Sequence, residues 1–363
     1  MDQSSIFDVK LVSSGRWLTL YDVLETERAL WQVGGIRKCT YAAPVLLAGA
    51  GFERPEEMRF SSWHVRYSVL SRWAGREAFT WSHSALVETE PQTTIAYRRP
   101  PELDLVETGD LRLTLVHHLS EAWRHADEAE IELRDVVAVR VSRLARNSLE
   151  GYFESSLCFQ RFLTLVTHEL VRPLSVNAVV AQPDNTGSAD DAFVEVLYQP
   201  VEAAKGVKQR RGSPMLLKLE EISGHEAEYV SNWFKMAERL KPVADLYFGT
   251  LYNPSAYLDF NFLCLAHAAE AYHRHVIGGE DVPAEDHEKR MGEVVGAVPE
   301  QYQKWLREKL RWSNELSLRR RLKELFSKWA HILTPDKVGD HGDVVRSIVS
   351  FRQACMKAAG HRC

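Results

Sequence analysis

The last part of this chain has the hydrophobic period of helices, whereas most of what precedes it has that of strands, and this contrast constrains the fold more than any other feature. Up to about residue 145, segments such as Arg16–Asp22 and Phe60–Val69 alternate apolar and polar residues or are rich in aromatic and β-branched ones, which is typical of β-strands. After about residue 223, apolar residues instead recur every three or four positions, which is typical of packed helices. The sequence therefore predicts an α+β protein in which a β-rich domain precedes an all-α domain.

The β-rich domain is predicted to span residues 1–222. Beyond the two segments above, its predicted strands are Thr93–Tyr97, Leu111–His117, Ile131–Val141, Val176–Val180 and Phe193–Tyr198. A helix is expected at Leu149–Thr167, and exposed loops at Gln182–Asp191 and Lys205–Ser213. The simplest closure for these strands is an antiparallel sandwich or barrel. Its tryptophans fit either a hydrophobic core or a platform for sugars or bases.

The helical domain is predicted to span residues 223–363 and to form a bundle of four or five helices. Its clearest helix carries an apolar seam with spacings of 4, 3, 4, 3 and 4 and ends at Gly278-Gly279. The residues of this seam are Leu258, Phe262, Leu265, Ala269, Tyr272 and Val276. Other helices are expected at Glu226–Leu240, from Pro299 to Trp312, after a Ser317 cap, and at Val344–Met356.

Composition removes several classes of protein. Hydrophobic residues make up 45% of the 363 positions, and the longest nearly apolar run, residues 42–52, is too short for a membrane helix. No secretory signal pattern is visible at the start, so we expect a cytoplasmic protein. The five cysteines include no CxxC pair, and the signatures GxxxxGK[ST], GxSxG and HExxH are absent. We therefore expect neither a metal nor a cofactor.

Positive charge is concentrated at the end of the chain. Residues 301–363 hold 14 Lys and Arg against 6 Asp and Glu, whereas residues 1–300 hold 31 against 44. Such a basic segment fits phosphate-backbone binding, and it equally fits a solvated helical surface. Within it, the consecutive Arg319, Arg320 and Arg321 are candidates for RNA phosphate contacts.

A polar flank follows the apolar seam of the clearest helix. His267, Glu270 and Arg274 lie at positions i, i+3 and i+7, and Glu270 with Arg274 forms a favourable i, i+4 pair. This flank is either a solvated salt bridge or part of a functional surface. His267 and His273 lie about 240° apart around the helix, so they cannot share a metal ion.

A second pair of candidates lies near the end of the chain. Arg352 and His361 form an Arg/His pair in a basic setting. Such a pair supports RNA cleavage without a metal, because histidine exchanges protons near neutral pH and arginine neutralises the charge that develops on phosphorus.

Four blocks taken together resemble the ApeA-like proteins, which have an ApeA N-terminal domain followed by an ApeA-like HEPN domain. The blocks are Phe60–Phe79, Phe159–Thr167, Tyr257–Arg274 and Ser317–Phe326, and the resemblance runs from about Val12 to Phe351. It implies a prokaryotic antiphage defence protein, an HEPN ribonuclease that acts by abortive infection. It also implies a homodimer, since two helical bundles pair in such proteins and an Arg-x4-6-His motif on the last helix of each forms a metal-independent site.

The sequence departs from the family at this motif. The family reads Arg-Asn-x-x-x-His on its final helix, and Arg352 aligns with its arginine, but Gln353 replaces the asparagine and Lys357 stands at the histidine position. His361 lies half a turn away from Arg352 on a continuous helix. Lysine binds phosphate but exchanges protons near neutral pH only when burial lowers its pKa strongly.

Three functions therefore stay open. The first is an RNA-binding and RNA-cleaving defence protein in which Arg352 with His361 or Lys357 is catalytic and Glu270 and Arg274 position the substrate, tRNA being one candidate RNA. In that case the N-terminal domain senses a phage-derived trigger. The second is an inactive HEPN module that dimerises and binds RNA or protein. The third is a β-sandwich protein with a helical tail that either binds carbohydrate through exposed tryptophans or serves as a scaffold.

Overall fold

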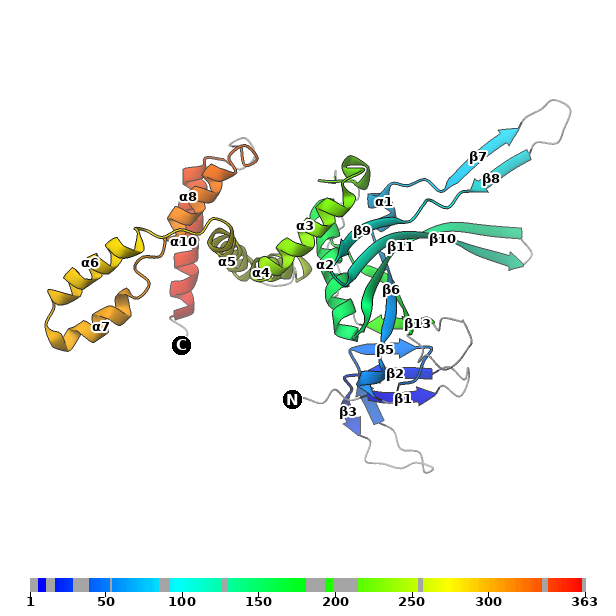
Figure 1. Ribbon diagram of the computed structural model, residues 1–363, viewed down its shortest axis with the longest axis horizontal. Coiled ribbons are helices and arrows are strands. Elements are labelled where there is room, and N and C mark those ends of the chain that lie inside the picture. Colours follow the sequence, from blue (N-terminus) through cyan, green and yellow to red (C-terminus); the bar gives the residue numbers. More distant parts are fainter. Residues whose placement is uncertain are drawn as a thin grey trace. The chain divides into compact units, whose positions relative to one another are not determined.

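The computed structural model describes residues 6–10, 17–28, 39–52, 54–84, 92–125, 129–180, 193–198, 215–253, 257–334 and 339–360. The chain divides into two compact units, Met1–Met236 and Ala237–Cys363, and their positions relative to one another are not determined (Figure 1). The predicted loops at 182–191 and 205–213 lie outside the described residues. None of the described helices is long and apolar enough to cross a membrane.

The first unit is built on an antiparallel sheet with the strand order β1-β2-β5-β13-β12-β6-β11-β10-β9. Its strands in chain order are β1 (Ile6–Lys10), β2 (Trp17–Tyr21), β5 (Val45–Ala48), β6 (Phe60–Tyr67), β9 (Leu103–Thr108), β10 (Leu111–His125), β11 (Ala129–Asn147), β12 (Pro173–Val180) and β13 (Phe193–Tyr198). The predicted strands fall within or over strands of this sheet, except Thr93–Tyr97, which lies in a separate hairpin. The predicted antiparallel, β-rich N-terminal domain is therefore confirmed.

Two shorter hairpins accompany this sheet. They are formed by β3 (Leu24–Arg28) with β4 (Cys39–Ala42) and by β7 (Phe79–Ser84) with β8 (Gln92–Tyr97). The turn between β9 and β10 contains Gly109 at φ 58°, a left-handed conformation that glycine adopts without a steric cost. The short helices α1 (Leu70–Ala74), η1 (Pro55–Glu57) and η2 (Leu219–Ile222) complete this part of the chain.

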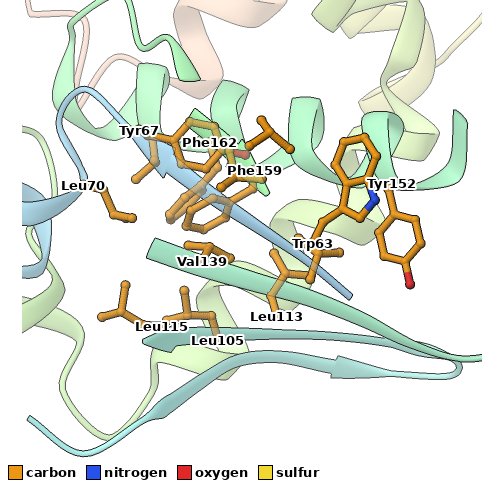
Figure 2. Packing of buried hydrophobic residues seen from close by; sticks show 14 of the residues in the cluster. Trp63, Tyr67, Leu70, Leu105, Leu113, Leu115, Val139, Tyr152, Phe159 and Phe162 are labelled. Atoms are coloured by element: carbon orange, nitrogen blue, oxygen red, sulfur yellow. The ribbon is translucent and has the colours of Figure 1, made fainter. Parts of the chain in front are cut away.

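The main sheet is covered by a helix, α2 (Leu149–Thr167), where the sequence suggested a sandwich or barrel. Figure 2 shows Tyr152 and Phe159 of α2 lying over Trp63 and Val139 of the sheet. The ring of Trp63 stacks on that of Tyr152 at 5.4 Å with an interplanar angle of 5°. Apolar and polar residues alternate along the strands because only one face of the sheet packs against this helix. Either a helix or a second sheet can bury such a face.

Hydrogen bonds from aromatic side chains fix α2 to its surroundings. The Tyr152 hydroxyl donates to the carbonyl of Phe60 at 3.1 Å, and the Tyr67 hydroxyl donates to the carbonyl of Ser156 at 2.8 Å. The Trp233 indole donates to the carbonyl of Cys158 at 2.9 Å. Since Trp233 lies on α3 (Glu226–Arg239), the first helix after the sheet begins inside the first unit, and the division falls 14 residues after the boundary suggested by the sequence.

The second unit is helical and agrees with the predicted all-α domain. Its helices are the end of α3, then α4 (Lys241–Tyr252), α5 (Leu258–Val276), α6 (Ala284–Gly296), α7 (Glu300–Leu310), α8 (Leu318–Lys328) and α10 (His341–Gly360). Pro242, which follows the helix predicted at Glu226–Leu240, lies in the first turn of α4, where proline is well tolerated. Ser317 caps α8 as predicted, with its hydroxyl accepting a hydrogen bond from the Arg320 amide at 3.4 Å.

Candidate functional site

Helices α5, α8 and α10 pack against one another and position the candidate residues of the second unit. Their apolar cluster contains Leu318, Leu322, Leu325 and Val345, with Ala269, Tyr272, Ile348 and Val349 packed around them. Leu318, Leu322 and Leu325 of α8 thus share a core with Ala269 and Tyr272 of the predicted α5 seam. Leu258 and Leu265, which the sequence placed in the same seam, are instead 80% and 43% exposed.

Arg352 of α10 meets the polar flank of α5. Its guanidinium lies 3.3 Å from the Glu270 carboxylate, and the two side chains are 21% and 16% exposed. Its Nε atom is buried and has no hydrogen-bond partner among the described residues. Glu270 also accepts a hydrogen bond from Arg274 at 3.3 Å, and Arg274 in turn pairs with Glu315 at 2.5 Å. Glu270 therefore contacts two arginines, and Arg274 bridges Glu270 and Glu315.

The ion pairs continue into the interior through α8. Arg321 is 3% exposed; its Nε donates to the carbonyl of Leu316 at 2.9 Å, and its side chain lies 3.6 Å from Glu315. Its Nη1 lies 3.3 Å from Nδ1 of the fully buried His273, whose Nε2 lies 2.8 Å from Glu324. Because a guanidinium only donates, Nδ1 of His273 accepts and Nε2 carries the proton toward Glu324. His273 is therefore a structural link with both ring nitrogens in use.

Glu324 closes this network at the surface. The hydrogen bond from His273 lowers the pKa of Glu324, and a hydrogen bond from Arg320 adds to the effect. Arg320 lies 2.7 Å from Asp281 and 3.2 Å from Glu324. Arg320 thus joins α8 to the segment before α6.

The structure separates the three consecutive arginines. Arg321 is buried and paired, Arg320 is half exposed and engaged in two ion pairs, and Arg319 is exposed. Arg319 is accordingly the member of this run best placed to contact a phosphate. Lys357 lies on α10, but its side chain is among those that the structure does not describe, and His361 lies outside the described residues.

Sequence reasoning missed the His273–Arg321–Glu324 link. The available signal was the heptad position of His273, which lies between the seam residues Tyr272 and Val276. Its burial depends on a partner from α8, 48 residues away along the chain from His273 to Arg321, and no local pattern indicates that pairing.

The first unit holds a separate group of titratable side chains. His117 is buried, and its Nδ1 lies 2.8 Å from Asp135, which also accepts a hydrogen bond from Tyr97 at 3.1 Å. Its Nε2 has no partner among the described residues. On β6, burial lowers the pKa of His64 to about 4, with a further contribution from the positive charge of Arg140, its register partner on β11.

The chain thus has a two-part α+β architecture, a β-sheet unit followed by a helical unit. A family model described as ApeA N-terminal domain 1 matches residues 2–233, and a model described as Apea-like HEPN matches residues 263–355. The chain belongs to the ApeA family, with an Apea-like HEPN domain after the ApeA N-terminal domain. No curated protein and no solved structure matches it.

Proposed function

We propose that this chain is a prokaryotic antiphage defence protein that binds RNA and cleaves it without a metal ion, acting in the cytoplasm by abortive infection. The family membership supports a defence role. Its partners in this proposal are RNA, tRNA among the candidates, a second copy of the chain paired through the HEPN domain, and a phage-derived trigger sensed by the N-terminal unit.

One observation carries the proposal to this chain's own residues. Arg352, at the family's arginine position, is held by Glu270 at 3.3 Å in a setting that is only partly open to water. A guanidinium oriented in this way neutralises the charge that develops on phosphorus during cleavage, and it acts more strongly where water is scarce. Glu270 orients it, Arg274 positions the substrate, and Arg319 contributes a phosphate contact.

The proton transfers need a second group. Lys357 stands at the histidine position and His361 follows it, so these two residues remain our sequence-based candidates for that role. Either one works with Arg352 only if the end of α10 brings its side chain back toward Glu270.

The alternative function is an HEPN module that dimerises and binds RNA or protein without cleaving. The replacement of the family's asparagine and histidine by Gln353 and Lys357 favours it. In that case Arg352 serves binding and the stability of the bundle, and chemistry is absent.

Cleavage of end-labelled tRNA and total RNA in excess EDTA tests the proposal. We expect cleavage by the full chain to fall about 100-fold or more in Arg352→Ala, the usual cost of removing one contact to a developing charge. Arg346→Ala is the matched control, because Arg346 lies on the same helix, is exposed and pairs only locally with Asp343 among the described residues. We expect it to cleave like the unchanged protein.

The outcomes separate the two functions. Cleavage that requires added metal, or equal cleavage by both arginine variants, contradicts the ribonuclease proposal. RNA retained in mobility-shift assays without any cleavage supports the binding module instead.

A further inference from the structure

Two contacts define the face of α5 that meets α10. The rings of Phe262 and Phe351 lie 4.6 Å apart, and Glu270 lies 3.3 Å from Arg352. At about 100° per residue, Phe262 and Glu270 are about 80° apart around α5, so α10 lies against the arc between them. Phe351 and Arg352 are consecutive on α10. The two helices therefore cross between residues 262 and 270 of α5.

His267 lies at this level and beside this arc. It precedes Glu270 by three residues, a spacing at which helical side chains are neighbours with Cβ atoms about 5–6 Å apart. Around the axis of α5, His267 lies about 60° from Glu270, on the side opposite to Phe262. Its side chain is exposed. An accessible imidazole thus stands next to the carboxylate that holds Arg352, with Arg274 one turn beyond Glu270 on the same flank.

The other two histidines of α5 do not share this position. His273 is fully buried and uses both ring nitrogens, toward Arg321 and Glu324. His275 is exposed but lies about 140° around the helix from Glu270. Of the histidines on α5, His267 alone combines exposure with proximity to the Arg352 anchor.

We propose that His267 is a catalytic residue that moves the protons in RNA cleavage, in place of the histidine missing from the last helix. This inference rests on the proposed ribonuclease function. The neutral imidazole takes the proton of the ribose 2′-hydroxyl while the 2′-oxygen forms a bond to phosphorus. The bond from phosphorus to the 5′-oxygen then breaks, and the imidazolium returns the proton to that leaving oxygen. Arg352 and Arg274 neutralise the phosphate as charge builds up on it.

The balance of this reaction fixes its products. No proton is gained or lost overall, and no water or metal ion takes part in this step. Each cut therefore leaves a 2′,3′-cyclic phosphate on one fragment and a 5′-hydroxyl on the other.

The test compares His267→Ala with His275→Ala in the full chain, using end-labelled tRNA in excess EDTA. We expect His267→Ala to lower the cleavage rate by about 100-fold or more, as is typical for loss of a general acid–base group. His275→Ala is expected to keep the rate within about twofold, as for a surface change away from the site. Added imidazole is expected to restore cleavage by His267→Ala and not by Arg352→Ala, which a structural role for His267 does not explain.

The outcomes separate this inference from the function on which it rests. If the unchanged chain cleaves and Arg352→Ala does not, while His267→Ala equals His275→Ala, the assignment of His267 is wrong and the ribonuclease stands. Loss of cleavage in Lys357→Ala or His361→Ala with full activity in His267→Ala overturns it in the same way. No cleavage by the unchanged chain overturns both.

Discussion

Replacing either of two buried tryptophans by phenylalanine tests how the core of the first unit is held together. Trp63 and Trp73 are both fully buried, so Trp63→Phe and Trp73→Phe remove the same atoms from the same kind of surroundings. They differ in one respect. The Trp73 indole donates a hydrogen bond to the carbonyl of Leu217 at 3.1 Å, whereas the Trp63 indole nitrogen has no partner among the described residues.

This difference sets the expected magnitudes. Each change removes two ring carbons from the core, which costs about 1.5 kcal/mol of unfolding free energy at about 0.8 kcal/mol per buried carbon. At position 73 the lost hydrogen bond adds about 0.5–1.5 kcal/mol, for a total of about 2–3 kcal/mol. At position 63 the change also removes a buried N–H that has no partner among the described residues, and removing this desolvation penalty regains about 1–3 kcal/mol of unfolding free energy. Trp63→Phe is therefore expected to lie between a loss of about 0.5 kcal/mol and a gain of about 1.5 kcal/mol.

The measurement is urea unfolding of the full chain followed by far-UV circular dichroism, at one protein concentration for all variants. We expect the two variants to differ by about 3 kcal/mol, or about 6–12 °C in a thermal scan for a unit of this size. Equal destabilisation by the two changes, or a greater loss in Trp63→Phe, would refute the reasoning from the indole hydrogen bond.

Two further changes test single contacts. Because burial and Arg140 depress the pKa of His64 to about 4 in the folded state, its contribution to stability is complete above its unfolded value of about 6.5 and is lost as the pH falls toward 4. We expect His64→Asn to reduce the fall in urea midpoint between pH 7 and pH 4.5, and an unchanged pH dependence contradicts this assignment. Ser317→Ala is expected to cost about 1 kcal/mol in thermal unfolding by removing the cap of α8, while the exposed Ser327→Ala on the same helix costs little; equal costs would argue against the cap.

Helices whose apolar stripe runs over several turns were predictable from the sequence. The helix at Leu149–Thr167 and the helix beginning at Leu258 have the predicted bounds, because their apolar stripes run for several turns and their ends carry a cap or Gly278-Gly279. Strand β10 extends beyond its predicted end at His117 to His125, and this outer half pairs with β11.

The sequence did not predict which distant segments pair with one another. Strand β6 lies between β11 and β12, and α2 covers the sheet from a position between those two strands in the chain. Alternation along a strand indicates that one face is buried, but it does not indicate whether a helix or another sheet buries it. The expectation of a sandwich or barrel therefore gave way to a sheet covered by α2.

For the candidate site, the sequence determined which residues could be proposed for the chemistry, and the tertiary structure decided which of their side chains are buried in ion pairs and which are exposed. The run Arg319–Arg321 and the spacing of His267, Glu270 and Arg274 are local features, since a helix repeats every 3.6 residues and shows its faces in the sequence. The burial of Arg321 against His273 and the seating of Arg352 on Glu270 required α8 and α10 to pack on α5. Burial and ion pairing arise between helices that are distant in the chain, and those contacts separate the arginines that hold the bundle together from those that can meet a phosphate.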